Sequence, residues 1–188
     1  MNLFIDLKSE GENTYAVLEK LINDKFADIF SWVDPSEGVV HQGHVHCIIT
    51  GNRPIDTIAN TKGLRFCSID APDMSYVSCS QENLFPITSM KWQDVFGEFK
   101  YFLFKKDLEK LDGMIQESRA NNARLRFWSA PNFFVLWKQL MDADGEKDTI
   151  VINADYLSWA VDSLKGKGYN NTNQGCSNEP GWCAENND

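Results

Sequence analysis

Residues 3–8, LFIDLK, decide the fold of this chain. Side chains alternate in direction along a β-strand, so Phe4, Asp6 and Lys8 share one face and the apolar residues between them share the other. A carboxylate and an ammonium group at the end of an apolar strand are costly to bury without a partner or a task. This pattern is typical of a β/α-barrel strand whose last residues open into an active site.

Strand and helix patterns alternate along the rest of the chain. Apolar, β-branched runs predict strands at 45–50, 64–69, 125–130 and 149–155, and a short strand or an extended segment at 87–92. Apolar residues at helical spacing predict helices at 13–30, 54–60, 105–121, 133–142 and 156–164. This alternation predicts an α/β fold with a parallel sheet, either doubly wound or a barrel.

The length of the chain limits how complete such a barrel can be. A full barrel has eight strands and typically about 250 residues, whereas the chain has 188. A composition rich in Gly, Asn and Ser sets residues 166–188 apart as a polar tail outside the fold. We therefore expect residues 1–165 to form an incomplete TIM-type (β/α) barrel that lacks about the first three βα units. Its open sheet edges favour aggregation or self-association.

The composition argues against several classes of partner. The formal net charge is −9 and there is no run of Lys or Arg, which argues against nucleic acid and against electrostatic docking on anionic membranes. No apolar run approaches the roughly 20 residues that span a bilayer, so we expect no transmembrane segment. The N-terminus does not resemble a signal peptide, because it lacks a basic start.

The cysteines and a sequon bear on the compartment. The five cysteines include no CxxC pair and no zinc spacing. Cys47 and Cys67 lie in strand-like runs and are expected to be buried thiols. Cys176 and Cys183 could form a local disulfide in the polar tail, and Asn170 begins a glycosylation sequon. Both tail features are compatible with a secreted protein, and the compartment stays unknown.

Five segments occur in a recognisable order: LFIDLKSEG, CIITGNRP, the FP-ITSMKW region, ARLRFWSAPN and IVINADYLSW. Together they resemble the C-terminal part of the glycerophosphodiester phosphodiesterase and phosphatidylinositol phospholipase C-like superfamily. The similarity is to the branch that includes the fungal altered inheritance of mitochondria protein 6. It spans about residues 3–164. LRFWSAPN is the most specific motif, and INADY resembles the final Asn-Thr-Asp strand of the family.

This resemblance implies that residues 1–165 are the C-terminal portion of a β/α-barrel phosphodiesterase. Such enzymes use a divalent cation, Mg²⁺ or Ca²⁺, to clamp the phosphate, and two histidines as general acid and base. By matching position, Asp6 would be a metal carboxylate, Lys8 would face the phosphate and Trp128 would line the substrate pocket. No counterpart of the family's His-containing or Glu-x-Asp motif is found. The catalytic residues are therefore unknown, and this chain alone is expected to be inactive.

The strand at 45–50 has polar residues at both ends. Arg53 follows its carboxyl end, where a planar guanidinium could contact phosphate; the alternative is a loop arginine paired with a carboxylate. His44 and His46 invite a metal-site interpretation. They lie at the start of the strand, however, whereas a barrel's active site lies at the other end. We therefore favour a structural or surface role for these histidines, and for His41.

Polar residues also lie on the last two predicted strands. Arg126 and Trp128 share a face, and we favour a packing role for Arg126 and a site role for Trp128. Asn153 and Asp155 share a face of the last strand. Asp suits the cap of a following helix, which we favour for Asp155, while Asn153 stays a candidate site residue.

Two functional hypotheses stay open. The first is a metal-dependent phosphoric diester hydrolase that acts on glycerophosphodiesters or phospholipid head groups, with the missing strands and histidines supplied from outside this sequence. The second is a non-catalytic family remnant or binding module, which predicts no divalent-cation site and no turnover. A weaker third hypothesis is another metal-dependent barrel hydrolase that uses His44 and His46.

Overall fold

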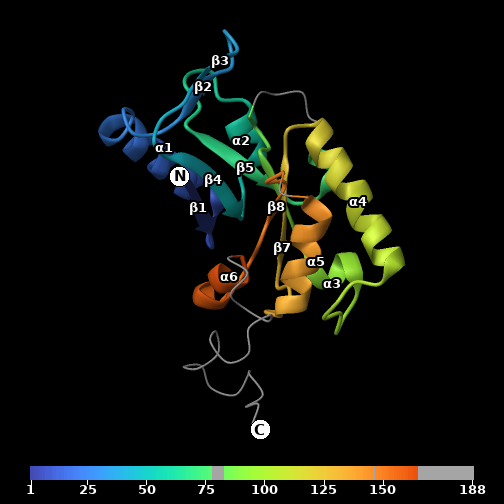
Figure 1. Ribbon diagram of the computed structural model, residues 1–188. Helices are drawn as coiled ribbons and strands as arrows, with labels where there is room; N and C mark the ends of the chain where they lie inside the picture. The colour runs from blue at the N-terminus through green and yellow to red at the C-terminus, as the bar shows by residue number, and fades with distance from the viewer. Residues whose placement is uncertain (78–82, 146, 165–188) are drawn as a thin grey trace, which may run out of the picture. The chain divides into compact units, whose positions relative to one another are not determined.

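A computed structural model describes residues 1–77, 83–145 and 147–164 (Figure 1). The chain divides into two compact units. Unit 1 comprises Met1–Ser89 and Ser118–Arg124, and unit 2 comprises Met90–Glu117 and Leu125–Asp188. The predicted tail at 166–188, with its sequon at Asn170 and with Cys176 and Cys183, lies outside the described residues. The expectation of a single domain over 1–165 stays a prediction.

Unit 1 is built from parallel strands, one hairpin and short helices (Figure 1). The parallel strands are β1 (Asn2–Leu7), β4 (His46–Gly51), β5 (Cys67–Ala71) and β6 (Ile87–Lys91), of which β6 continues into unit 2. The antiparallel hairpin is formed by β2 (Trp32–Asp34) and β3 (Val39–His41). The helices are α1 (Gly11–Lys25), α2 (Ile55–Ala59) and the 3-10 helix η1 (Met74–Tyr76).

The parallel strands of unit 1 follow the order β1-β4-β5-β6, each parallel to its neighbour. Their spatial order is thus their order along the chain, with the hairpin inserted between β1 and β4. A barrel is wound in this way, whereas a doubly wound sheet reverses its order at a switch point. The α/β class with parallel strands is confirmed, and the winding is consistent with an incomplete barrel.

Alternate residues of these strands form the core beneath the helices. Core residues include Leu7 of β1, Cys47 and Ile49 of β4, Cys67 and Ile69 of β5, Tyr15 and Ile22 of α1 and Ile58 of α2. The expectation that Cys47 and Cys67 are buried thiols is confirmed. Because side chains alternate along a strand, Asp6, Thr50 and Asp70 lie on the opposite face of the sheet, away from this core.

In its described residues, unit 2 contains two parallel strands and four helices. The strands are β7 (Arg124–Trp128), whose first residue belongs to unit 1, and β8 (Ile150–Val151). The helices are α3 (Trp92–Phe96), α4 (Lys105–Ala120), α5 (Phe134–Asp144) and α6 (Leu157–Leu164). Trp92 packs on Phe96 and Phe127, with ring centroids 4.4 and 5.8 Å away. No helix among the described residues is long and apolar enough to cross a membrane.

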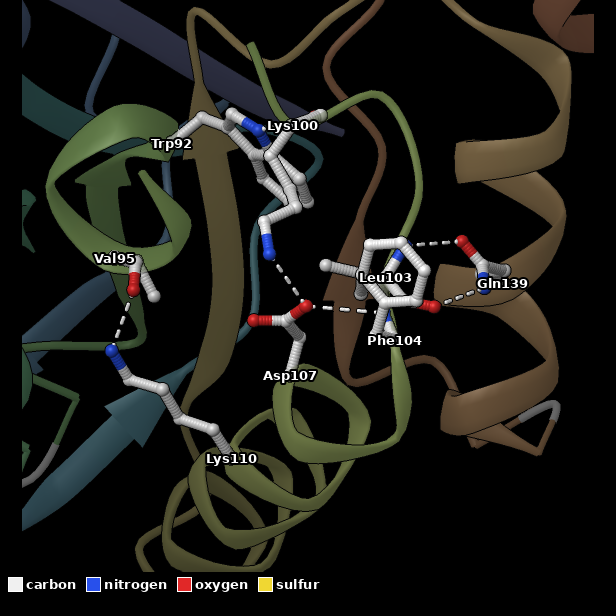
Figure 2. Close-up of polar contacts among 8 residues, drawn as sticks. All are labelled: Trp92, Val95, Lys100, Leu103, Phe104, Asp107, Lys110 and Gln139. Carbon is white, nitrogen blue, oxygen red and sulfur yellow. Dashed lines mark hydrogen bonds and ion pairs between the residues drawn. The ribbon is translucent and has the colours of Figure 1, made fainter. Parts of the chain in front are cut away.

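Side chains of three helices hold the connection between α3 and α4 in place. Gln139 of α5 faces Leu103: the Leu103 N–H donates to Gln139 Oε1 at 2.7 Å, and Gln139 Nε2 donates to the Leu103 carbonyl at 2.8 Å (Figure 2). Trp92 of α3 donates from Nε1 to the Lys100 carbonyl at 2.9 Å. In the first turn of α4, Asp107 Oδ2 accepts a hydrogen bond of 2.8 Å from Lys100 Nζ. The backbone of this connection is therefore fixed within unit 2.

The last predicted strand is much shorter than its sequence pattern. Residues 149–155 read as one strand, but β8 ends at Val151. Beyond it, Asn153 Oδ1 accepts a hydrogen bond of 2.6 Å from Arg126 Nη2. Asp155 exchanges hydrogen bonds with Asn132, in which its backbone N–H donates to Asn132 Oδ1 and its carboxylate accepts from Asn132 Nδ2. Side-chain hydrogen bonds of this kind compete with strand pairing.

Candidate functional site

Asp6 and Lys8 form an exposed ion pair at the carboxyl end of β1. The Lys8 Nζ lies 2.5 Å from Asp6 Oδ2, and their side chains are 82% and 45% exposed respectively. Asp6 pairs in register with Thr50 of the neighbouring strand β4. The structure therefore brings together Asp6 and Lys8, which the sequence predicted to lie on one face of the strand. Because the pair is solvated, its charges are accessible to a ligand.

Gly51 allows Asp6 to lie close to the end of β4. The φ angle of Gly51 is +78°, and a Cβ added there would lie 2.2 Å from Asp6 Oδ1 and 2.5 Å from the Leu7 carbonyl oxygen. A side chain would be strained at this backbone angle and would collide with both groups. The glycine in CIITGNRP thus makes room for the predicted metal carboxylate.

A second, buried ion pair lies beside Thr50. The Thr50 hydroxyl donates to Asp70 Oδ2 at 2.9 Å, and Arg53 Nη2 lies 3.7 Å from the same oxygen. Asp70 is fully buried and the Arg53 side chain is 17% exposed. Buried charges are stable only when they are paired, so Asp70 holds Arg53 at this edge. The carboxylate-paired arginine that the sequence left as an alternative is present.

An open hollow of about 380 Å³ adjoins Arg53. It is lined by Gly11, Glu12, Gly51, Asn52, Arg53, Pro54 and Ile55. The helix α1 begins there, and a helix N-terminus carries a partial positive charge. The negative charge of Glu12 in the first turn of α1 partly offsets this positive charge. The Glu12 carboxylate is already hydrogen-bonded to the Thr57 hydroxyl. The hollow therefore combines Arg53 with a helix N-terminus, which are groups that bind anions.

Trp128 belongs to the other unit. It is the last residue of β7, its side chain is partly exposed, and Lys91 Nζ lies 5.8 Å from its ring centroid. A lysine over an indole face is a cation–π arrangement. Trp128 thus offers an accessible aromatic surface next to a cation within unit 2.

The three histidines lie away from the carboxyl ends of β1 and β4. His46 is the first residue of β4 and lies 2.8 Å from the Ser68 hydroxyl. Burial and nearby positive charges lower the pKa of His46. His44 precedes the strand, and His41 stacks on Trp32 with ring centroids 5.0 Å apart. These positions agree with the structural and surface roles that the sequence favoured.

The described residues fit a divalent cation only in part. Carboxylate and hydroxyl oxygens suit Mg²⁺ and Ca²⁺, and Asp6 is an exposed carboxylate at the expected edge. Both Asp6 and Asp70, however, already face a cationic side chain. No group of three His, Cys, Asp or Glu side chains within 1–77, 83–145 and 147–164 is arranged to hold a metal. Asp6 therefore fits as one ligand of a set that needs further members.

Sequence reasoning missed Asp70 as a site residue. The predicted strand at 64–69, LRFCSI, is followed directly by Asp70. A carboxylate at the end of an apolar strand is the same signal that singled out Asp6.

Comparison with known proteins provides no relative for this chain. No protein-family model, curated protein or solved structure matches it.

Proposed function

We propose that the carboxyl-end site of unit 1 is part of a metal-dependent phosphoric diester hydrolase of the glycerophosphodiester phosphodiesterase type. The observation that carries this proposal is the line of Asp6, Thr50 and Asp70 across three neighbouring parallel strands, with Lys8 and Arg53 beside it. Ligands of parallel α/β folds bind at the carboxyl ends of the strands. The proposed substrates are glycerophosphodiesters or phospholipid head groups.

Each residue has a distinct role in this proposal. Lys8 and Arg53 bind the phosphate oxygens, and Arg53 does so while Asp70 holds its guanidinium in place. Asp6 supplies one carboxylate to a bound Mg²⁺ or Ca²⁺, which would stabilise charge on the phosphate. The resemblance alone assigns Trp128 of unit 2 to substrate binding, and the roles of the unit 1 residues do not depend on it.

The alternative is a binding module without catalysis. It is favoured by the cationic partners of Asp6 and Asp70 and by the location of the histidines away from this edge. Such a module binds a phosphate or phosphodiester through Lys8 and Arg53 without a divalent cation. It releases no product.

Hydrolysis of bis(p-nitrophenyl) phosphate by the whole chain, with Mg²⁺, with Ca²⁺ and with a chelator, separates the two functions. Cation-dependent nitrophenolate release that Asp6→Ala abolishes supports the hydrolase. Asp24→Ala is the matched control, because Lys20 and Asp24 form a similarly exposed pair at 2.6 Å. Binding of inorganic phosphate that neither Mg²⁺ nor Ca²⁺ strengthens, without turnover, supports the binding module. A chain that neither binds phosphate nor turns over the diester contradicts both functions.

The strand β1 also suggests self-association. Within the described sheet of unit 1 it lies at one edge, and Leu3 and Phe4 are exposed. An exposed edge strand can pair with a second chain, and we propose that two copies pair through β1. Analytical ultracentrifugation is expected to show concentration-dependent association that Phe4→Lys weakens. A wild-type chain that stays a monodisperse monomer would contradict this proposal.

A further inference from the structure

A cavity of about 80 Å³ lies at the amino end of the unit 1 sheet, opposite the end that carries Asp6 and Arg53. It is lined by Val33 and Val40 of the β2–β3 hairpin and by residues at the starts of β4 and β5. Val33 and Arg65 exchange backbone hydrogen bonds of 2.9 and 2.8 Å, which fasten the hairpin to the chain before β5. The cavity is therefore formed where the hairpin meets the first residues of two parallel strands.

The polar side chains of this cavity are all able to donate hydrogen bonds. They belong to Ser31, Gln42, His46, Arg65, Ser68 and Asn83. No Asp or Glu is among the described residues that line the cavity, although the whole chain carries a formal net charge of −9. Donors without a carboxylate favour an anion over a metal cation as the occupant.

Ser68 determines which ring proton His46 carries. The Ser68 hydroxyl donates to the Asn83 carbonyl oxygen at 2.6 Å. Because a hydroxyl has a single proton, the 2.8 Å contact between His46 Nε2 and Ser68 Oγ is a hydrogen bond that the ring donates. His46 thus keeps its Nε2 proton, and the contact orients the ring without activating the Ser68 hydroxyl as a nucleophile.

Arg65 gives the cavity a permanent positive charge. Only 2% of this residue is exposed, and charges act more strongly where water is excluded. Its planar guanidinium carries five N–H donors in a geometry that matches phosphate oxygens. Burial comes first among the causes that lower the pKa of His46, and the positive charges of the amino terminus, Arg124 and Arg65 follow. An anion in the cavity would offset these positive charges.

The size of the cavity limits the occupant to one small group. Its volume exceeds the roughly 30 Å³ that one water molecule takes in liquid water, and it is far below the roughly 300–1,000 Å³ of sites that hold a whole drug-sized ligand. The donors come from the hairpin region and from two strands, an arrangement that suits a tetrahedral oxyanion better than a planar carboxylate. Gln42 and Asn83 are exposed, so the cavity is reached from solvent beside them.

We propose that this cavity binds a phosphate group, either as inorganic phosphate or at the end of a larger molecule that extends into solvent past Gln42 and Asn83. Arg65 contacts the phosphate oxygens with its guanidinium fork. Ser31 donates a further hydrogen bond: its Oγ accepts the Gly43 N–H at 3.1 Å, a bond that leaves the hydroxyl proton unused. The site is independent of the proposed hydrolase, whose residues in unit 1 lie at the carboxyl ends of the strands.

The pKa of His46, followed by NMR of the three histidines in the whole chain, tests this inference. Saturating inorganic phosphate, compared with chloride at the same ionic strength, is expected to raise this pKa by about one unit, because a nearby opposite charge favours the charged ring. His44 is exposed and outside the lining of the cavity, so its resonances are expected not to respond. A rise with phenyl phosphate as well assigns the site to the phosphate group of a larger molecule, whereas a rise with inorganic phosphate alone assigns it to the free ion.

Gln42→Glu places a carboxylate at the edge of the cavity. It is expected to weaken phosphate binding, measured from the His46 chemical shift, about tenfold, because like charges repel strongly where water is excluded. Gln42 is exposed, so the fold is expected to be retained. Gln116→Glu is the matched control, because Gln116 is exposed on α4, does not line the cavity and undergoes the same change of charge. It is expected to bind phosphate as wild type does.

Lys8→Met separates this site from the phosphate contacts proposed at the carboxyl end of β1. This variant is expected to keep the response of His46 to phosphate. A pKa of His46 that phosphate leaves unchanged, or a Gln42→Glu chain that binds phosphate as tightly as wild type, would overturn the inference. A His46 response that disappears in Lys8→Met would also overturn it and would assign the phosphate to the carboxyl-end site.

Discussion

Two ion pairs at the same end of the unit 1 sheet differ in length and in burial. Asp6 and Lys8 approach to 2.5 Å and are exposed, whereas Arg53 and Asp70 are 3.7 Å apart and largely buried. An exposed pair contributes about 0–1 kcal/mol to stability, whereas removing one partner of a buried pair costs about 3–5 kcal/mol. Burial rather than distance therefore decides which pair supports the fold and which one can engage a ligand.

The largest expected effect comes from the buried pair. Asp70→Asn leaves the Arg53 guanidinium without its opposing charge and should lower the free energy of unfolding by about 3 kcal/mol. Urea unfolding measures this change. Thr50→Val, which removes the 2.9 Å hydrogen bond to Asp70 and the longer one of 3.4 Å from Arg53 but leaves both charges in place, should cost about 1 kcal/mol. Equal costs for the two variants would contradict the importance of the buried charge.

Gly51→Ala tests the close approach of the exposed pair to β4. We expect a loss of about 2 kcal/mol, because the added Cβ combines an unfavourable φ with a collision. Gly38→Ala is the control, since Gly38 also has a positive φ of +67° but has nothing within 4 Å of an added Cβ. Thermal unfolding of both variants isolates the collision with Asp6 and Leu7. A Gly51→Ala chain as stable as the Gly38→Ala chain would exclude that collision.

The amino end of the sheet should respond to pH through His46. Burial, together with the positive charges of the amino terminus, Arg124 and Arg65, lowers the pKa of His46 below 6.5. Below that pH the unfolded chain binds a proton that the folded chain resists, so stability should decrease as pH falls below 6.5. His46→Gln should flatten this part of the profile of unfolding free energy against pH. An unchanged slope in the variant would assign the pH dependence to other groups.

The smallest expected effect on stability is at the exposed pair. Asp6→Asn should change the free energy of unfolding by less than about 0.5 kcal/mol, because water screens both charges. Asp24→Asn on α1 should behave in the same way in the same thermal melts. A loss of several kcal/mol in Asp6→Asn alone would show that Asp6 is structural and would weaken its assignment as a ligand.

Much of the strand framework could be predicted because periodicity and strand ends are local signals. The pattern at 3–8 predicted β1 to within one residue, and the run at 45–50 predicted β4 as closely. The sequence patterns also placed Asp6 near the carboxyl end of its strand and Arg53 just beyond the carboxyl end of the next one. The pairing of Asp6 with Thr50 in register follows from the parallel arrangement of β1 and β4.

The other parts of the fold and of the candidate site depend on contacts between residues far apart in the sequence, which no local pattern encodes. Strands of three residues, as in the β2–β3 hairpin, are too short to show an alternation. Trp92 was assigned to a strand but begins α3, where its ring is buried against Phe96 and Phe127. The pairing of Arg53 with Asp70 joins a residue that follows β4 to one on β5, and the sequence alone could not choose Asp70 among many carboxylates.

The most direct test of the central claim is calorimetric titration of glycerophosphocholine into the whole chain in the presence of Ca²⁺. We expect wild type and Asp24→Ala to bind it, and Asp6→Ala and Lys8→Met to lose most of that binding, without loss of stability in any of the three variants. No binding by wild type, or equal binding by wild type and Asp6→Ala, would contradict the claim that the exposed pair at the end of β1 engages a phosphodiester.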